Sequence, residues 1–214
     1  MYRYILFDFD GTVFDTAEGI TKSVRYALNK QGIDMELSEL RCFAGPPLID
    51  MYLERIGGTM EQAERFVHDY RERYKPIGIN ECRIFPGIKE LLEELRAAGR
   101  KTAVATLKPQ YLAETLIERE GIDGLFDAVC GTPPDGKGST KKDCCLRAMS
   151  IMGAAPEETV LVGDTKYDII GAHEAGIFAV GAGYGYAAPG ELAAAKADVI
   201  VPDVKALRDW LLEN

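Results

Sequence analysis

Six polar residues of this sequence stand where short apolar runs end or where the next helix begins. These residues are Asp8, Asp10, Thr106, Lys141, Asp164 and Asp168. The carboxyl ends of parallel strands meet at one edge of an open sheet, so residues far apart in the sequence can converge there. Converging carboxylates repel one another, and without a cation at least one must take up a proton. A hard divalent cation removes this conflict, and oxygen ligands with room for water suit Mg²⁺.

The same residues could also bind and cleave a phosphoryl group. A metal ion, the Lys141 amine and the Thr106 hydroxyl would attract it, together with backbone N–H groups of the turn Asp10-Gly11-Thr12. A carboxylate can attack phosphorus to form an aspartyl-phosphate, which divides one difficult displacement into two easier steps. The side chain two residues further along a strand points to the same side. Asp10 could therefore protonate the leaving oxygen and later activate water for Asp8.

The elements that must position these residues follow from hydrophobic patterning. Short apolar runs lie at 4–9, 102–106, 127–131, 159–163, 177–183 and 198–201. Between most of them, apolar residues recur at helical spacing, as in the segment from Ile88 to Leu95 and in the helix that opens near Thr140. Strands that alternate with helices predict an α/β fold with a doubly wound parallel sheet.

Residues 16–80 contain no convincing strand and predict a helical insert after the first strand. Ile20, Val24 and Leu28 mark one amphipathic helix. Pro47 could occupy the first position of a second helix. Thr59 and Gln62 have the spacing of a capping box that opens a third. We therefore expect a catalytic core formed by residues 1–15 and 81–214, with an α-helical cap domain at 16–80.

Four motifs at these positions resemble those of the haloacid dehalogenase superfamily. They are DFDGT at 8–12, Thr106 in VATLKP, Lys141 in STKKD, and VGDTKYD at 162–168. The helical insert lies where that family carries its cap, so the resemblance covers the whole chain. It implies a Rossmann-like core and a magnesium-dependent phosphatase.

The resemblance also implies a role for each matched residue. Asp8 would be the nucleophile and a metal ligand, and Asp10 the general acid and base whose backbone carbonyl contacts the metal. Thr106 would bind phosphate, and Lys141, or its neighbour Lys142, would steady the nucleophile and the phosphoryl charge. Asp164 would complete the metal site. Asp168 would be a further metal ligand, a residue behind a ligand, or the partner of Lys141.

Departures from the family patterns reduce the number of reactions that we expect of this protein. Dehalogenases of this fold lack an acid at the position of Asp10, and sugar phosphomutases carry a histidine near the position of Ile20. The segment CFAGPPL at 42–48 resembles a loop of phosphoglycolate phosphatases and nucleotidases. We expect a phosphoglycolate phosphatase-like enzyme, with a 5'-nucleotidase as the main alternative. A sugar phosphomutase and a non-catalytic module that binds a phosphorylated ligand are further alternatives.

The composition limits the partners. The chain has 214 residues, and its 25 Lys and Arg against 34 Asp and Glu give a net charge of −9, which disfavours nucleic acid and anionic membranes. The five cysteines show neither disulfide nor zinc spacing. The first apolar stretch is too short for a signal peptide or membrane span. We expect a cytoplasmic monomer or homodimer that binds Mg²⁺ and a small phosphorylated metabolite.

Overall fold

The computed structural model describes residues 1–134 and 139–214. These residues form two compact units. Unit 1 comprises Met1–Phe14 and Ile84–Asn214, and unit 2 comprises Asp15–Arg83. A two-stranded sheet of β2 (Phe14–Asp15) and β3 (Arg83–Ile84) stands where the chain passes from one unit to the other.

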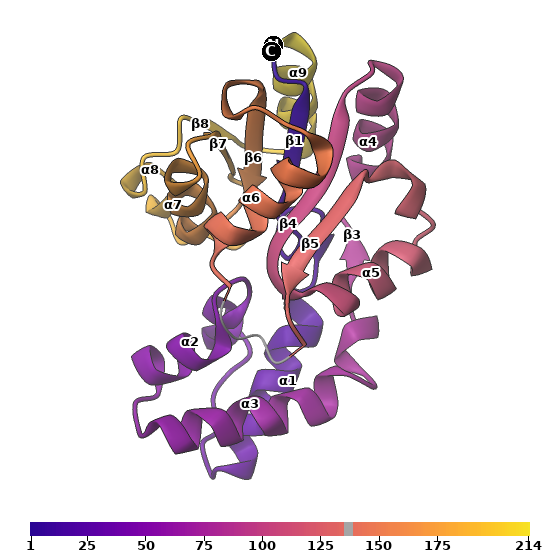
Figure 1. Ribbon diagram of the computed structural model, residues 1–214. Coiled ribbons are helices and arrows are strands. Elements are labelled where there is room, and N and C mark those ends of the chain that lie inside the picture. Colours follow the sequence, from indigo (N-terminus) through magenta and orange to yellow (C-terminus); the bar gives the residue numbers. More distant parts are fainter. Residues whose placement is uncertain (135–138) are drawn as a thin grey trace. The chain divides into compact units, whose positions relative to one another are not determined.

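Unit 1 is built on a six-stranded parallel sheet (Figure 1). Its strands, in spatial order, are β5 (Ala128–Thr132), β4 (Lys101–Pro109), β1 (Tyr4–Phe7), β6 (Thr159–Gly163), β7 (Phe178–Ala182) and β8 (Val199–Val201). The chain adds strands on one side of β1 and then on the other. The predicted doubly wound α/β fold is therefore confirmed, with β1 at the point where the strand order reverses.

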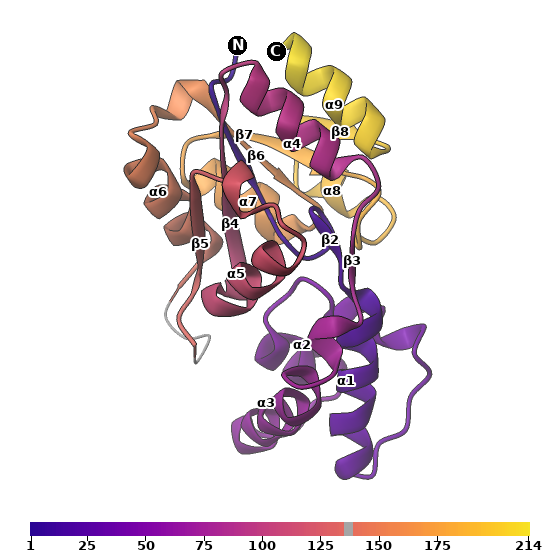
Figure 2. The same ribbon diagram turned by 90° about the vertical axis from the view of Figure 1, so that its right-hand side faces the viewer.

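Helices cover both faces of this sheet. They are α4 (Ile88–Ala97), α5 (Gln110–Arg119), α6 (Lys141–Met152), α7 (Lys166–Glu174), α8 (Glu191–Ala194) and α9 (Val204–Glu213). Figure 2 shows α4 and α9 together on one side of the sheet, whereas α6 lies on the other. The short 3₁₀ helices η3 (Asp123–Leu125) and η4 (Pro156–Glu158) lie in connections between these elements.

The central strand alternates its side chains between the two faces of the sheet. Tyr4 and Leu6 belong to a core cluster that also contains Cys144 and Met149 of α6. The intervening residue Ile5 is equally buried and points to the opposite face. Asp8 follows in the same alternation as Leu6, so its side chain lies on the face that α6 covers.

Two strand limits differ from the sequence-based expectation. β1 ends at Phe7 because the carbonyl of Phe9 already accepts hydrogen bonds from the N–H groups of Val13 and Phe14, which form a tight turn. β4 extends to Pro109, because a shift in its pairing register with β5 carries the strand past Thr106.

Unit 2 is helical, as the sequence predicts. It contains α1 (Ala17–Lys30), α2 (Leu48–Arg55) and α3 (Met60–Tyr74), with the 3₁₀ helices η1 (Glu39–Phe43) and η2 (Gly78–Asn80). The ring of Phe66 on α3 packs 5.0 Å from that of Tyr52 and 5.8 Å from that of Phe43, measured between centroids. Pro47 is the N-cap residue of α2, one position before the first helical residue that the sequence predicts it to be. Across the described residues, the structure contains no helix with the length and hydrophobicity of a membrane span.

The capping box of α3 should contribute measurably to stability. Thr59 accepts a hydrogen bond from the Gln62 N–H, and the Gln62 side chain accepts one from the Thr59 N–H. We expect Thr59→Ala to lower the free energy of unfolding in urea by about 1 kcal/mol. The matched control is Thr115→Ala, which makes the same change at an exposed position inside α5 and should alter stability by less than about 0.5 kcal/mol. Equal effects would contradict the capping role.

Candidate active site

Asp8 and Lys141 form a buried ion pair at the carboxyl end of the sheet. The N–H of Asp8 donates to the Val162 carbonyl, which places Asp8 directly after β1 and beside β6. Lys141 Nζ donates to Asp8 Oδ1 at 2.7 Å and to the Ala105 carbonyl of β4 at 3.0 Å. The lysine therefore joins β1, β4 and α6. Lys142, the next residue, is exposed.

Thr140 explains why Lys141 stands at the first position of α6. Its hydroxyl accepts from the Asp143 N–H, and Asp143 in return accepts from the Thr140 N–H, so a capping box begins the helix there. A cation at a helix N-terminus is electrostatically disfavoured. The two carboxylates that face Lys141 more than offset this penalty.

Asp168 is the second carboxylate on Lys141. Its Oδ1 lies 2.7 Å from Lys141 Nζ. Its Oδ2 accepts from the N–H and the hydroxyl of Thr165, at 2.9 and 2.8 Å, and thereby caps α7. Of the three roles that the sequence leaves open, the structure displays the pairing with Lys141.

Asp164 is held by the turn that follows β1 and by a loop after β7. Its Oδ1 accepts from the Thr12 hydroxyl at 3.1 Å, and its Oδ2 accepts from the Tyr186 N–H at 2.7 Å. Gly11 has a φ of +87° and packs against the Asp164 carboxyl, where any Cβ would collide. Glycine is needed at this position for both reasons.

Three carboxylates meet at this edge without enough positive charge to balance them. Ligand oxygens of Asp8, Asp164 and Asp168 lie within 4.8 Å of one another, and all three residues are buried. Burial, followed by the charge of Asp168, raises the pKa of Asp8 to about 6. Burial raises the pKa of Asp164 as well. Although burial alone would lower the pKa of Lys141, the charges of Asp168 and Asp8 raise it above its ordinary value.

This donor set fits a hard divalent cation. The cluster holds three carboxylates, of which those of Asp8 and Asp168 pair with Lys141, so a bound cation would relieve their repulsion. Oxygen-only ligands are those preferred by Mg²⁺. Asp8, Asp164 and Asp168 are accordingly the side chains that could hold it.

The side chain of Asp10 stands apart from this cluster. Both of its carboxylate oxygens accept from Lys108 Nζ, at 2.9 and 3.2 Å. Sequence reasoning missed Lys108, although it belongs to the VATLKP segment. The available signal was its spacing from Thr106, because residues two apart on a strand share a side.

The turn after β1 engages two of the backbone donors that the sequence predicts for phosphate. The N–H groups of Gly11 and Thr12 donate to the carbonyls of Phe14 and Phe9 at 2.8 and 3.4 Å. Phosphate binding by these groups stays a prediction. Thr106 is buried immediately after Ala105, whose carbonyl contacts Lys141, and thus lies at the same edge of the sheet.

A loop after β7 was also missed by sequence reasoning. Tyr184 donates its hydroxyl to the Thr12 carbonyl at 3.1 Å, and burial raises its pKa. The N–H of Tyr186 contacts Asp164 as described above. The sequence GYGY after an apolar run was the signal for a turn, but it did not reveal the contact with residues 12 and 164.

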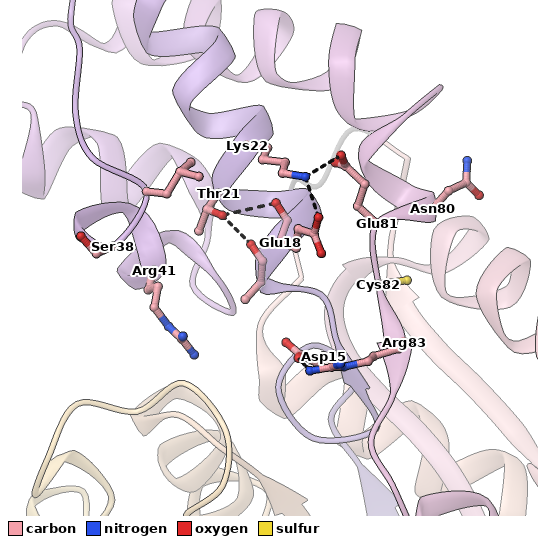
Figure 3. A pocket seen from close by; sticks show the side chains of 12 residues that line it. Asp15, Glu18, Thr21, Lys22, Ser38, Arg41, Asn80, Glu81, Cys82 and Arg83 are labelled. Atoms are coloured by element: carbon pink, nitrogen blue, oxygen red, sulfur yellow. Dashed lines mark hydrogen bonds and ion pairs between the residues drawn. The ribbon is translucent and has the colours of Figure 1, made fainter.

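Unit 2 contains an open cavity of about 770 Å³. Its lining carries charges of both signs, and Figure 3 shows the side chains of Lys22, Arg41 and Arg83 together with Asp15, Glu18 and Glu81. Lys22 pairs with Glu18 at 2.5 Å and with Glu81 at 3.2 Å, and Arg83 pairs with Asp15 at 3.3 Å. The cavity therefore offers both donors and acceptors to a polar ligand.

Comparison with known proteins establishes the family. Residues 5–182 match the haloacid dehalogenase-like hydrolases. The chain belongs to this family. A 5'-nucleotidase from Pseudomonas aeruginosa is 38% identical over 211 residues, which are 98% of this chain and 96% of that protein. Tyrosine-protein kinase PtkA from Mycobacterium tuberculosis is 37% identical over 185 residues, which are 86% of this chain and 63% of that protein.

A solved structure gives the same result for the fold. The crystal structure of a predicted phosphatase from Clostridium acetobutylicum has a TM-score of 0.96 and 39% identity, with all of both chains covered. The resemblance that the four motifs indicate is thus confirmed. This haloacid dehalogenase-like protein is a hydrolase with the α/β core of its family.

The raised pKa of Asp8 predicts that metal binding depends on pH. Its carboxyl group, with a pKa of about 6 in the metal-free protein, must lose its proton before it can bind a cation. We expect the affinity for Mg²⁺ to rise from about pH 5 to about pH 7, with proton release detected by calorimetry in buffers of different ionisation enthalpy. Asp164→Asn should bind Mg²⁺ more weakly throughout. An affinity that does not change with pH would contradict this prediction.

Proposed function

We propose that this hydrolase is a magnesium-dependent phosphatase that cleaves a small phosphomonoester through an aspartyl-phosphate. The observation that carries the proposal is the buried Asp8–Lys141 pair beside Asp164 and Asp168. A nucleophile, a cation and a set of metal ligands stand together where parallel strands end. Unit 2 would act as the cap that reads the leaving group.

In the first step, a carboxylate oxygen of Asp8 would form a bond to phosphorus while the bond to the leaving oxygen breaks. Lys141 holds Asp8 Oδ1 at 2.7 Å, so it orients the nucleophile and attracts the phosphoryl oxygens. The Thr106 hydroxyl would donate to the same group. Asp10 would give its proton to the leaving oxygen, which departs as an alcohol.

In the second step, water would attack phosphorus and Asp10 would accept a proton from it. The bond between phosphorus and the Asp8 oxygen then breaks, which restores the carboxylate and releases phosphate. Mg²⁺, held by Asp8, Asp164 and Asp168, would supply positive charge to the phosphoryl group when bound. The chain thus offers a residue for each role in this chemistry, with Asp8 as nucleophile, Asp10 as acid and base, and Thr106 and Lys141 as donors to the phosphoryl group.

Nucleoside monophosphates and phosphoglycolate are the two substrate candidates. The 38% identity to a 5'-nucleotidase favours nucleoside monophosphates. The segment 42–48 keeps phosphoglycolate as the second candidate.

Removal of the nucleophile provides the decisive test. We expect Asp8→Asn to lower the rate of phosphate release from p-nitrophenyl phosphate with Mg²⁺ by roughly 1,000-fold or more, because no covalent intermediate can form. The matched control is Asp209→Asn, the same change at an exposed residue that pairs only weakly with Arg208 at 3.1 Å, and it should retain activity. Chelation of Mg²⁺ should also abolish turnover. Activity retained in Asp8→Asn would refute the proposal.

A substrate panel tests the choice of leaving group. We expect kcat/KM to be higher for nucleoside monophosphates than for phosphoglycolate. Phosphoryl transfer to a protein tyrosine without release of phosphate would indicate a kinase in place of a phosphatase.

A further inference from the structure

Lys108 is a buried lysine that none of the steps above employs. Its side chain is 4% exposed, and its Nζ makes a two-point contact with Asp10 at 2.9 and 3.2 Å. The same Nζ lies 5.6 Å from the centroid of the Phe9 ring, which is a favourable cation–π distance. Removing an ammonium group from water costs several kcal/mol, so its burial calls for a partner that holds it there.

Strand β4 is irregular in the segment that carries Lys108. The pairing register between β4 and β5 shifts between Ala105 and Pro109, and such bulges redirect side chains next to functional sites. Gly131 allows β5 to lie close to the backbone of Lys108, because a Cβ at position 131 would lie 2.6 Å from the Lys108 carbonyl oxygen. The N–H of Lys108 donates to the Thr106 hydroxyl at 3.2 Å. The lysine is therefore fixed to the proposed phosphate-binding residue as well.

We propose that Lys108 is a positioning residue that holds the Asp10 carboxyl group in the orientation required for proton transfer. This inference rests on the proposed function. A two-point contact fixes the plane of the carboxyl group, whereas a single contact would let it rotate. Lys108 forms and breaks no covalent bond and keeps its own protons. The proton still passes from Asp10 to the leaving oxygen, and later from water to Asp10.

A competing role makes different kinetic predictions. If Lys108 instead bound the substrate phosphate, its loss would raise KM for every phosphomonoester and leave kcat nearly unchanged. A positioning residue for Asp10 affects kcat, and its contribution disappears when Asp10 can no longer transfer a proton. The two roles are therefore separated by a double-mutant cycle.

The experiment uses the full chain with Mg²⁺ and two aryl phosphates. For phenyl phosphate, whose leaving group needs a proton, Lys108→Met should lower kcat about 10- to 100-fold and change KM less than about 3-fold. For 2,4-dinitrophenyl phosphate, which needs no acid, release of the first equivalent of phenolate should slow much less. Lys108→Arg should recover part of the lost kcat, because it keeps a positive charge beside Asp10.

The cycle is completed with Asp10→Asn. In that background, Lys108→Met should change the first-turnover rate on 2,4-dinitrophenyl phosphate, and the steady-state rate, less than about 2-fold. An equal loss of kcat in both backgrounds, or a rise in KM alone, would overturn the inference. If the wild-type protein releases no phosphate, the proposed function itself fails before any variant is compared.

Folding of the variants can be controlled within the same set. Lys108→Met leaves a buried carboxylate without this partner and could lose stability, whereas Lys108→Met combined with Asp10→Asn removes both charges. Circular dichroism of the four proteins identifies any that unfold. Should Lys108→Met be unfolded, Lys108→Arg replaces it in the cycle, and a loss of kcat confined to the Asp10 background supports the inference. The same loss in the Asp10→Asn background would refute it.

Discussion

The arrangement of the whole site depends on one buried ammonium group, that of Lys141. Its Nζ lies 2.7 Å from carboxylate oxygens of both Asp8 and Asp168 and 3.0 Å from the Ala105 carbonyl. One cation thus joins the ends of β1 and β4 to the starts of α6 and α7. Neither carboxylate could remain charged in this buried position at low cost without it, and the lysine could not be buried without them. These four elements must therefore be assembled together.

Two local devices make this assembly possible. Capping boxes at Thr140 and Thr165 begin α6 and α7 at defined residues, so Lys141 and Asp168 enter the site from the first turns of their helices. The tight turn after β1 folds back onto Phe9 and brings the Thr12 hydroxyl to Asp164. The parallel strands bring their carboxyl ends to one edge of the sheet. The two caps and the turn then fix where the side chains of Lys141, Asp168 and Thr12 lie at that edge.

Much of this arrangement could be predicted from the sequence, and the failures have clear physical causes. Apolar runs located the strands, with β6 at 159–163 as expected, because buried parallel strands read as continuous apolar segments. The spacing of Lys108 from Thr106 indicates the side of β4 on which it lies, but β4 also shifts its register with β5 there, and the local sequence does not reveal that shift. The hydrogen bonds that the N–H groups of Gly11 and Thr12 make within their own turn were not predicted, because the sequence does not show the extent of the turn. The contact of Tyr184 with Thr12 joins residues 172 positions apart.

The two carboxylate oxygens of Asp168 have separate tasks, and this has a consequence for how the site can change over evolutionary time. One oxygen faces Lys141, and the other closes the first turn of α7. Glutamate would move both oxygens outward, and asparagine would keep the cap but remove the charge. A substitution that keeps the cap of α7 therefore loses the ion pair with Lys141, and one that keeps the ion pair loses the cap. Position 168 can accept a new residue only if position 141 or the start of α7 changes with it, so these sites are expected to vary jointly or not at all.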